Sequence, residues 1–187
     1  MWKLGLVLTA ALFIAGCDKA QQPASSSNVA NKVVARSALP AAGRKSPEKT
    51  VAGSALRKTY TMNESFDTVK EAVKDALTDR GLVVNNIAHI SNMLQRTGKD
   101  LGKTKKIYQK AENIEFCSAV VSRKTMEADP HNIIYCPYII SVYVLAKEPK
   151  KVYVSYRKLP RVKDKKSDQA LQEVEKLLDN IAKEATE

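Results

Sequence analysis

The chain has 187 residues, which suits one domain of ordinary size with extensions, and 44% of them are hydrophobic, so it can bury a core. Its 31 Lys and Arg outnumber 20 Asp and Glu, and the formal net charge of +11 favours anionic partners or simply serves solubility. Basic and aromatic residues do not interleave as they do in proteins that stack on bases, so nucleic acid is not expected as a partner.

Residues 1–16 have the pattern of an export signal. Lys3 precedes an apolar run from Leu4 to Ala15, which is shorter than the roughly 20 apolar residues that a membrane-spanning helix needs. The run ends in an aliphatic residue, two small residues and Cys17, which resembles the lipobox of bacterial lipoproteins. We therefore expect cleavage before Cys17 and its acylation by diacylglyceryl and palmitate-type chains. The alternative is an ordinary signal peptide in which the cysteine falls by chance.

This anchor predicts a lipoprotein of the bacterial cell envelope that faces the periplasm. In enteric bacteria, Asp directly after the lipid-bearing cysteine is associated with retention in the inner membrane, and Asp18 occupies that position here. Lys19 weakens this association, so the choice between inner and outer membrane stays open. Residues 17–54 are rich in Ala, Ser, Asn, Gln and Pro without an apolar period, which predicts a disordered tether. The average end-to-end distance of a flexible chain of n residues is about 5–6 Å × √n, so such a tether spans roughly 30–36 Å.

The globular domain is expected over residues 55–187. Residues 56–62 contain a short strand, and Ser65 caps a helix whose apolar stripe ends before Gly81. Further strands are expected at 82–84, 87–90 and 105–117, with helices at 91–101 and 118–128. The stripe of the first helix comprises Phe66, Val69, Val73, Ala76 and Leu77.

Residues 133–145 are almost continuous in Ile, Val and Tyr, which predicts a central strand. A turn at 147–150 joins it in a hairpin to the alternating strand 151–157. The last helix, about 167–184, has an apolar stripe through Leu171, Val174, Leu177 or Leu178, and Ile181, and an expected i,i+4 ion pair between Asp179 and Lys183. The order β-α-β…β-β-α predicts an α+β fold: a mainly antiparallel sheet with helices packed on one face.

Several short segments recur in an order that resembles the family known as domain of unknown function 302, over residues 56–160. They are Arg80 to Val84, His89-Ile90, Leu94 to Gly102, Glu115 to Ala119, Met126 to Pro130, Cys136-Pro137-Tyr138 and Val152 to Pro160. The resemblance implies a fold like that of the TATA-binding protein. It implies no catalytic residues, because the family has no settled activity. The family pattern has an apolar residue where this chain has Cys136.

Cys117 and Cys136 are 19 residues apart, and an even pair in an oxidising compartment favours a disulfide. Two buried free thiols remain an alternative, as does redox, haem or metal chemistry. A metal site would add His131 and His89 to Cys136, but the usual ligand spacings are missing, so no metal and no cofactor are expected.

The sequence contains no phosphate-binding loop, nucleophile elbow or dinucleotide fingerprint. It therefore favours a non-enzymatic protein without deciding the question. Arg96, Thr97, Lys99 and Asp100 are candidate ligand-binding residues, although a capped surface turn is the more common explanation of such a group. Six basic residues at 157–166 are candidates for contact with anionic lipid: Arg157, Lys158, Arg161, Lys163, Lys165 and Lys166.

Three functions remain open. The chain is expected to be a non-enzymatic ligand- or partner-binding module, with a redox or metal- or haem-handling protein that uses Cys117 and Cys136 as one alternative. A structural or interaction lipoprotein that acts through a basic surface is the other. The sequence leaves the oligomeric state open.

Overall fold

The computed structural model describes residues 55–187, and the predicted signal peptide, Cys17 and the tether lie outside the described residues. Among residues 55–187, no helix combines the length and apolar character needed to cross a membrane. The elements in chain order are β1 (Arg57–Met62), α1 (Phe66–Thr78), β2 (Val83–Ala88), α2 (Ile90–Asp100), β3 (Tyr108–Cys117), α3 (Ala119–Ala128), the 3-10 helix η1 (Pro130–Tyr135), β4 (Tyr138–Leu145), β5 (Val152–Arg157) and α4 (Lys165–Glu184).

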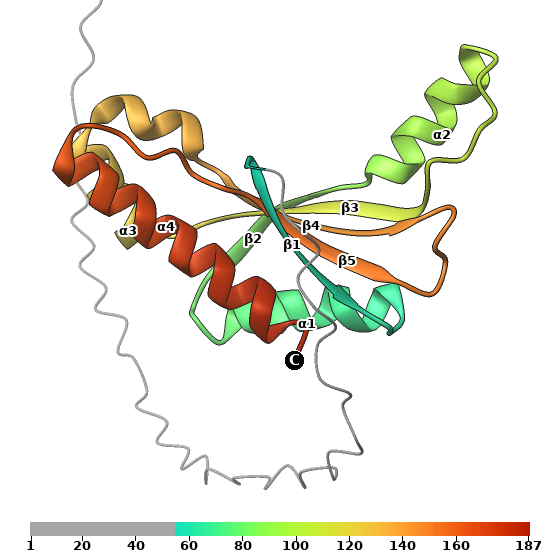
Figure 1. The fold of residues 1–187 in the computed structure, drawn as a ribbon, viewed down its shortest axis with the longest axis horizontal. Coiled ribbons are helices and arrows are strands. Elements are labelled where there is room, and N and C mark those ends of the chain that lie inside the picture. The colour runs from blue at the N-terminus through green and yellow to red at the C-terminus, as the bar shows by residue number, and fades with distance from the viewer. Residues whose placement is uncertain (1–54) are drawn as a thin grey trace, which may run out of the picture. The chain divides into compact units, whose positions relative to one another are not determined.

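The five strands form one sheet in the order β1-β5-β4-β3-β2, and all four neighbouring pairs are antiparallel. Helices α1 and α4 pack against the sheet, and α3 packs against α4 (Figure 1). The predicted α+β fold and its element order are therefore confirmed. The predicted central strand is β4, which lies between β5 and β3.

The strand register decides which side chains face the helices. Ile114 lies opposite Ile140, and Phe116 lies opposite Tyr138. These side chains are almost fully buried, and along β4 buried and half-buried residues alternate as the two-residue period of a strand requires. The buried apolar cluster runs from Phe66 to Ala185, so the core forms within the described residues.

Helix α1 follows its sequence pattern closely. Ser65 is in an extended conformation and its hydroxyl accepts a hydrogen bond from the Thr68 backbone amide, so the predicted N-cap is present. The five residues of the predicted apolar stripe are the five that the helix buries. Gly81 adopts φ +66° just beyond the helix, in the left-handed region that favours glycine.

Three local expectations were wrong. Residues 133–135 belong to η1 rather than to a strand, because the Asp129 carboxylate accepts the His131 amide and Pro130 occupies the first turn. Strand β2 ends at Ala88, and Ile90 already begins α2. Helix α4 begins at Lys165 because Asp164 accepts the Ser167 amide as its N-cap.

Candidate functional site

Helix α2 projects from the end of the sheet instead of lying on its face (Figure 1). Its C-terminus is closed by two backbone hydrogen bonds, from Lys103 N to Gly98 O (2.7 Å) and from Gly102 N to Lys99 O (3.1 Å). Gly102 has φ +64°, so this end is a Schellman motif. A Cβ atom on Gly98 would lie 2.6 Å from the Lys103 carbonyl oxygen. The sequence therefore specifies the end of this helix closely.

None of the 11 residues of α2 is buried. Apolar residues nevertheless recur at helical spacing, at Ile90, Met93, Leu94 and the C-cap residue Leu101. Ile90 and Leu94 are half-buried and the helix contacts β3, so the stripe is only partly covered. Met93 is 45% exposed and Leu101 64% exposed. Isolated helices of fewer than about 12–15 residues are marginal in water, so α2 has the properties of a helix that a partner covers.

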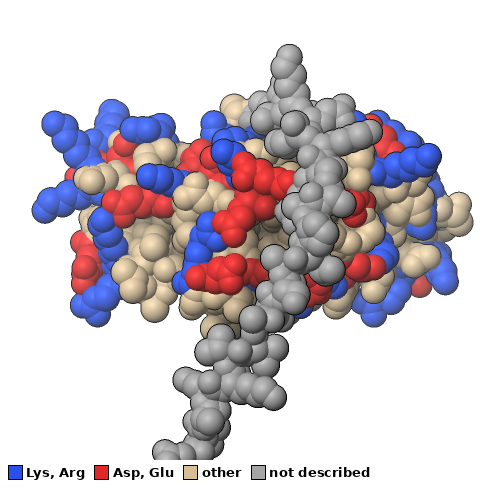
Figure 2. Space-filling view, turned by 90° about the horizontal axis from the view of Figure 1, so that it is seen from below, with Lys and Arg blue, Asp and Glu red and all other residues tan. Residues whose placement is uncertain are grey.

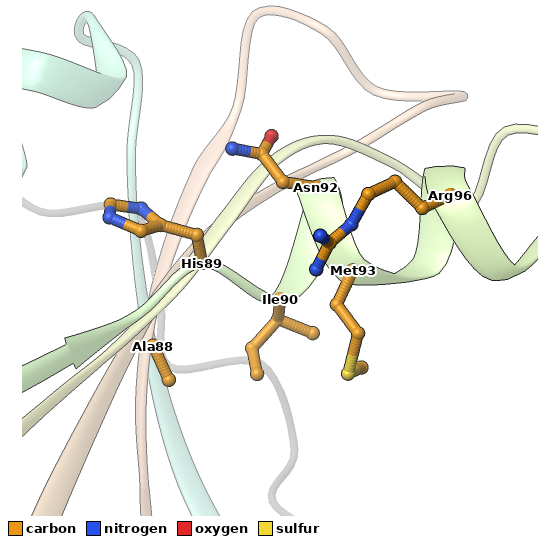
Figure 3. Close-up of a pocket in the computed structure, with 6 residues that line it drawn as sticks. All are labelled: Ala88, His89, Ile90, Asn92, Met93 and Arg96. Carbon is orange, nitrogen blue, oxygen red and sulfur yellow. The ribbon is translucent and has the colours of Figure 1, made fainter.

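A shallow hollow of about 590 Å³ lies where β2 leads into α2. It is lined by Ala88, His89, Ile90, Asn92, Met93 and Arg96 (Figure 3). Ile90 and Met93 point to one side of the helix, and Asn92 points to the other. The Arg96 side chain extends back toward the start of the helix, so it adds a positive charge to an otherwise mostly apolar surface.

The predicted ligand-binding residues do not converge on one point. Arg96 lines the hollow, whereas the other three do not. The Thr97 hydroxyl donates to the Met93 carbonyl oxygen of its own helix at 3.1 Å. Lys99 and Asp100 lie in the last turn of α2 and are exposed. Ligand binding by these four residues stays a prediction.

Cys117 and Cys136 lie side by side, with 3.1 Å between their sulfur atoms. Cys117 ends β3, and Cys136 caps η1 just before β4. A disulfide requires an S–S distance of about 2.05 Å, so the two residues are free thiols in this structure. The predicted disulfide is not formed here, although the sulfurs lie within reach of one another. The two sulfur atoms lie close together because Phe116, next to Cys117, is paired across β3 and β4 with Tyr138, two residues after Cys136.

Burial raises the pKa of the Cys117 thiol, and the neighbouring Cys136 sulfur raises it further. The Asn85 side chain and the Tyr138 backbone oppose this shift. Reactive cysteines usually have a lowered thiol pKa, so Cys117 is poorly suited to be an attacking thiolate. Both cysteines are half-buried. This environment favours a structural role for the pair over an exchange catalyst.

Neither histidine joins the cysteines in a recognisable metal site. Within residues 55–187, no group of three or more His, Cys, Asp or Glu side chains has an arrangement that could hold a metal ion. The His89 Nδ1 lies 3.0 Å from the Glu112 Oε1, and the Lys70 Nζ lies 3.3 Å from the Glu112 Oε2. His131 is exposed and contributes its backbone amide to the Asp129 cap.

A polar cluster that sequence reasoning missed centres on Asp179 of α4. Its Oδ1 accepts hydrogen bonds from the hydroxyls of Tyr60 (2.7 Å) and Tyr156 (2.8 Å) and lies 2.6 Å from the Lys58 Nζ. The predicted Asp179–Lys183 pair was therefore wrong, because Asp179 faces the sheet and Lys183 pairs with Glu187 at 3.4 Å. The cluster joins β1, β5 and α4, so its role is structural.

The basic residues at 157–166 lead into α4, at the opposite end of the sheet from α2 (Figure 1). Arg161 is already neutralised there by the Asp168 carboxylate, at 2.6 Å. Seen from below, Lys and Arg side chains stand out toward both ends of the domain, whereas Asp and Glu are most frequent toward the middle (Figure 2). On this face, basic side chains are therefore most prominent toward the two ends.

These features define an α+β domain with a covered sheet, a half-buried pair of thiols and a projecting amphipathic helix. The family model described as "Domain of unknown function DUF302" matches residues 58–185. The chain therefore belongs to the DUF302 family. The match extends beyond the segment that the sequence resemblance predicted and includes all of α4.

The structure is similar to the crystal structure of an uncharacterized conserved DUF302 protein from Bacillus stearothermophilus, with a TM-score of 0.59 and 14% sequence identity. The match covers 71% of this chain and 99% of that one. No curated protein matches the sequence.

Proposed function

We propose that this protein is a lipoprotein of the bacterial cell envelope, anchored through acylated Cys17 and facing the periplasm, whose DUF302 domain is a non-enzymatic binding module. The observation that carries the binding role is α2, an amphipathic helix with a closely specified end and a partly exposed apolar stripe. The lipobox pattern before Cys17 supports the anchor, and the tether would let the domain work at a distance from the lipid surface.

Crosslinking in intact cells tests the binding role. A photoreactive amino acid is placed at Met93 or Leu101 on α2, and in controls at Lys176 or Asn180, which are exposed on α4. We expect the α2 positions to capture a partner, lipid or protein, at several times the yield of the α4 positions. Equal yields at both helices would contradict the proposal.

The anchor is tested by replacing Cys17 with serine. Because serine cannot form the thioether to a diacylglyceryl group, we expect the variant to leave the membrane fraction or to remain an uncut precursor. Cell fractionation and the intact mass of the protein measure both outcomes. A variant with wild-type fractionation and wild-type mature mass would contradict lipid attachment.

A second function, redox or metal and haem handling, is favoured by the 3.1 Å separation of the Cys117 and Cys136 sulfurs. Two sulfur ligands suit soft ions such as Cu(I), and two adjacent thiols suit reversible oxidation. The raised pKa of Cys117 weighs against thiol exchange. Absorption spectra and metal analysis of protein purified from its own host test this function: a bound chromophore or stoichiometric metal would favour it over the binding module.

A further inference from the structure

The end of the domain that carries α2 also carries the β4–β5 turn. The Ala146 amide donates to the Ile107 carbonyl oxygen at 3.0 Å, and the Gln109 side-chain amide donates to the Ala146 carbonyl oxygen at 3.3 Å. These bonds hold the turn 146–151 beside the segment that leads from α2 into β3. We infer that this end, defined as residues 90–107 together with 146–151 and called the α2 end below, docks on the surface of an anionic phospholipid bilayer. The inference rests on the proposed role of α2 as the binding element and names its partner.

Positive charge dominates the α2 end. It contains eight basic and two acidic residues: Arg96, Lys99, Lys103, Lys105, Lys106, Lys147, Lys150 and Lys151 against Asp100 and Glu148. None of the eight basic side chains takes part in an ion pair within residues 55–187. At the opposite end, Arg161 is paired with Asp168, whereas the other five basic residues at 157–166 are likewise outside the ion pairs of the described residues. Arg96 and Lys99 lie on α2 itself, and the other six lie in the segment after it and in the β4–β5 turn. Basic clusters of this size are attracted to anionic lipid head groups.

Exposed apolar side chains accompany these charges. Met93 and Leu101 of α2 are joined by Ile107, which is 54% exposed in the segment after the helix. An amphipathic helix with Lys and Arg on one side and apolar residues on the other lies in the membrane interface, with its apolar face at the boundary of head groups and acyl chains. The α2 end has both parts of this pattern, and the projection of α2 from the sheet leaves the helix accessible (Figure 1).

Charge favours a bilayer over a second copy of this chain. Two copies that met through their α2 ends would bring sixteen basic residues together with four acidic ones, whereas an anionic bilayer offers a continuous complementary surface. The expected tether also ties the domain to a membrane, within roughly 30–36 Å. A docked α2 end would add a second contact to the lipid anchor, and contacts linked in this way reinforce one another.

Vesicle binding by residues 18–187, which lack the signal peptide and the acylated cysteine, tests the inference. Vesicles of phosphatidylcholine with about one third phosphatidylglycerol are compared with vesicles of phosphatidylcholine alone, at low and at high salt, by cosedimentation. We expect binding only to the anionic vesicles, with a loss of at least about tenfold in affinity at high salt because exposed charges are screened.

Two triple variants with equal changes in net charge locate the contact. In one, Lys103, Lys105 and Lys106 become Gln; in the other, Lys163, Lys165 and Lys166 at the opposite end become Gln. All six side chains are exposed. We expect the first variant to bind anionic vesicles about tenfold more weakly and the second less than threefold more weakly. Equal losses would show that net charge alone drives binding and would overturn the inference.

The double variant Met93→Gln with Leu101→Gln tests the apolar contribution, with circular dichroism to check that the domain is folded. We expect its binding to weaken about tenfold at constant charge, and unchanged binding would overturn an interfacial helix. Two results would overturn the lipid partner yet leave the binding module standing: α2 crosslinks to a protein without vesicle binding, or a dimer in solution that this double variant dissociates. Loss of selective α2 crosslinking would instead remove the proposed function itself.

Discussion

At the scale of single residues, Asp179 shows how one carboxylate joins three elements. Burial disfavours its charged form, but hydrogen bonds from Lys58, Tyr60 and Tyr156 outweigh that effect, so the pKa of Asp179 lies below its usual value. Burial raises the pKa of Tyr156, and the hydrogen bond from its hydroxyl to the negative Asp179 carboxylate raises it further. Asp179 is thus ionised in the folded domain and acts as a shared acceptor between β1, β5 and α4.

Replacing Asp179 with Asn should lower the free energy of unfolding by about 2 kcal/mol at neutral pH, because hydrogen bonds to a charged group contribute roughly 1.5–3 kcal/mol and this site is only partly buried. Urea denaturation measures the loss, and Asn180→Ala, on the exposed side of the same helix, serves as the control.

The same variant tests how the free energy of unfolding depends on pH. A carboxylate whose pKa is lower in the folded than in the unfolded state stabilises the fold fully above its unfolded value of about 4 and loses that effect as the pH falls through its folded pKa. The difference between wild type and Asp179→Asn should therefore shrink as the pH falls below about 4. A difference that stays constant down to pH values well below 4 would contradict the assignment of the charge to Asp179.

At the scale of elements, α1 and α2 end in the same way but differ in what they bury. Gly81 and Gly102 have φ near +65°, and an added Cβ would meet nothing within 4 Å at either position. Alanine at either position thus introduces backbone strain without a steric clash. Helix α1 contributes five residues to the core, whereas α2 contributes none.

Gly81→Ala should lower the global free energy of unfolding by about 1–2 kcal/mol, the cost of the left-handed conformation for an L-residue. Gly102→Ala should change global unfolding by less than about 0.5 kcal/mol, because α2 can open without exposing the core. Its effect should appear instead as faster amide hydrogen exchange confined to residues 90–103. A global loss as large as that of Gly81→Ala would show that α2 is coupled to the core.

The thiol pair links β3 to the segment before β4. If the exported protein is oxidised, the bond would close a 19-residue separation and stabilise the fold by about 3 kcal/mol. Cys117→Ser with Cys136→Ser should then lower the melting temperature under non-reducing conditions and have little effect in reductant. Peptide mass mapping with and without reduction identifies the bond directly, and free thiols in the exported protein would contradict it.

At the scale of the whole molecule, the proposed binding surface lies apart from the core. The core lies where α1 and α4 cover the sheet, and the α2 end extends beyond it (Figure 1). Changes on α2 are therefore expected to alter partner binding with little effect on stability, whereas changes at Asp179 or Gly81 should do the reverse. This division makes the binding experiments interpretable, because variants of α2 should remain folded.

Local patterns in the sequence predicted most of the elements. The spacing from Phe66 to Leu77 identified the buried face of α1, and the alternation around Val152 and Val154 identified β5, because both periods follow directly from backbone geometry. Residues 133–135 were mistaken for part of a strand because their apolar side chains suggest one, whereas the cap at Asp129 imposes a 3-10 turn. Short apolar runs do not distinguish between these conformations.

The sequence by itself determined the order of the elements and the family resemblance, since these follow from local patterns along the chain, and that order in turn predicted an antiparallel sheet. Only the tertiary structure decided that Asp179 meets Lys58, 121 positions earlier, rather than Lys183, and that the stripe of α2 stays partly exposed. Both depend on strand order and on where a helix leaves the sheet. Neither follows from periodicity, because an apolar stripe shows that a surface can be buried but does not identify the surface that covers it.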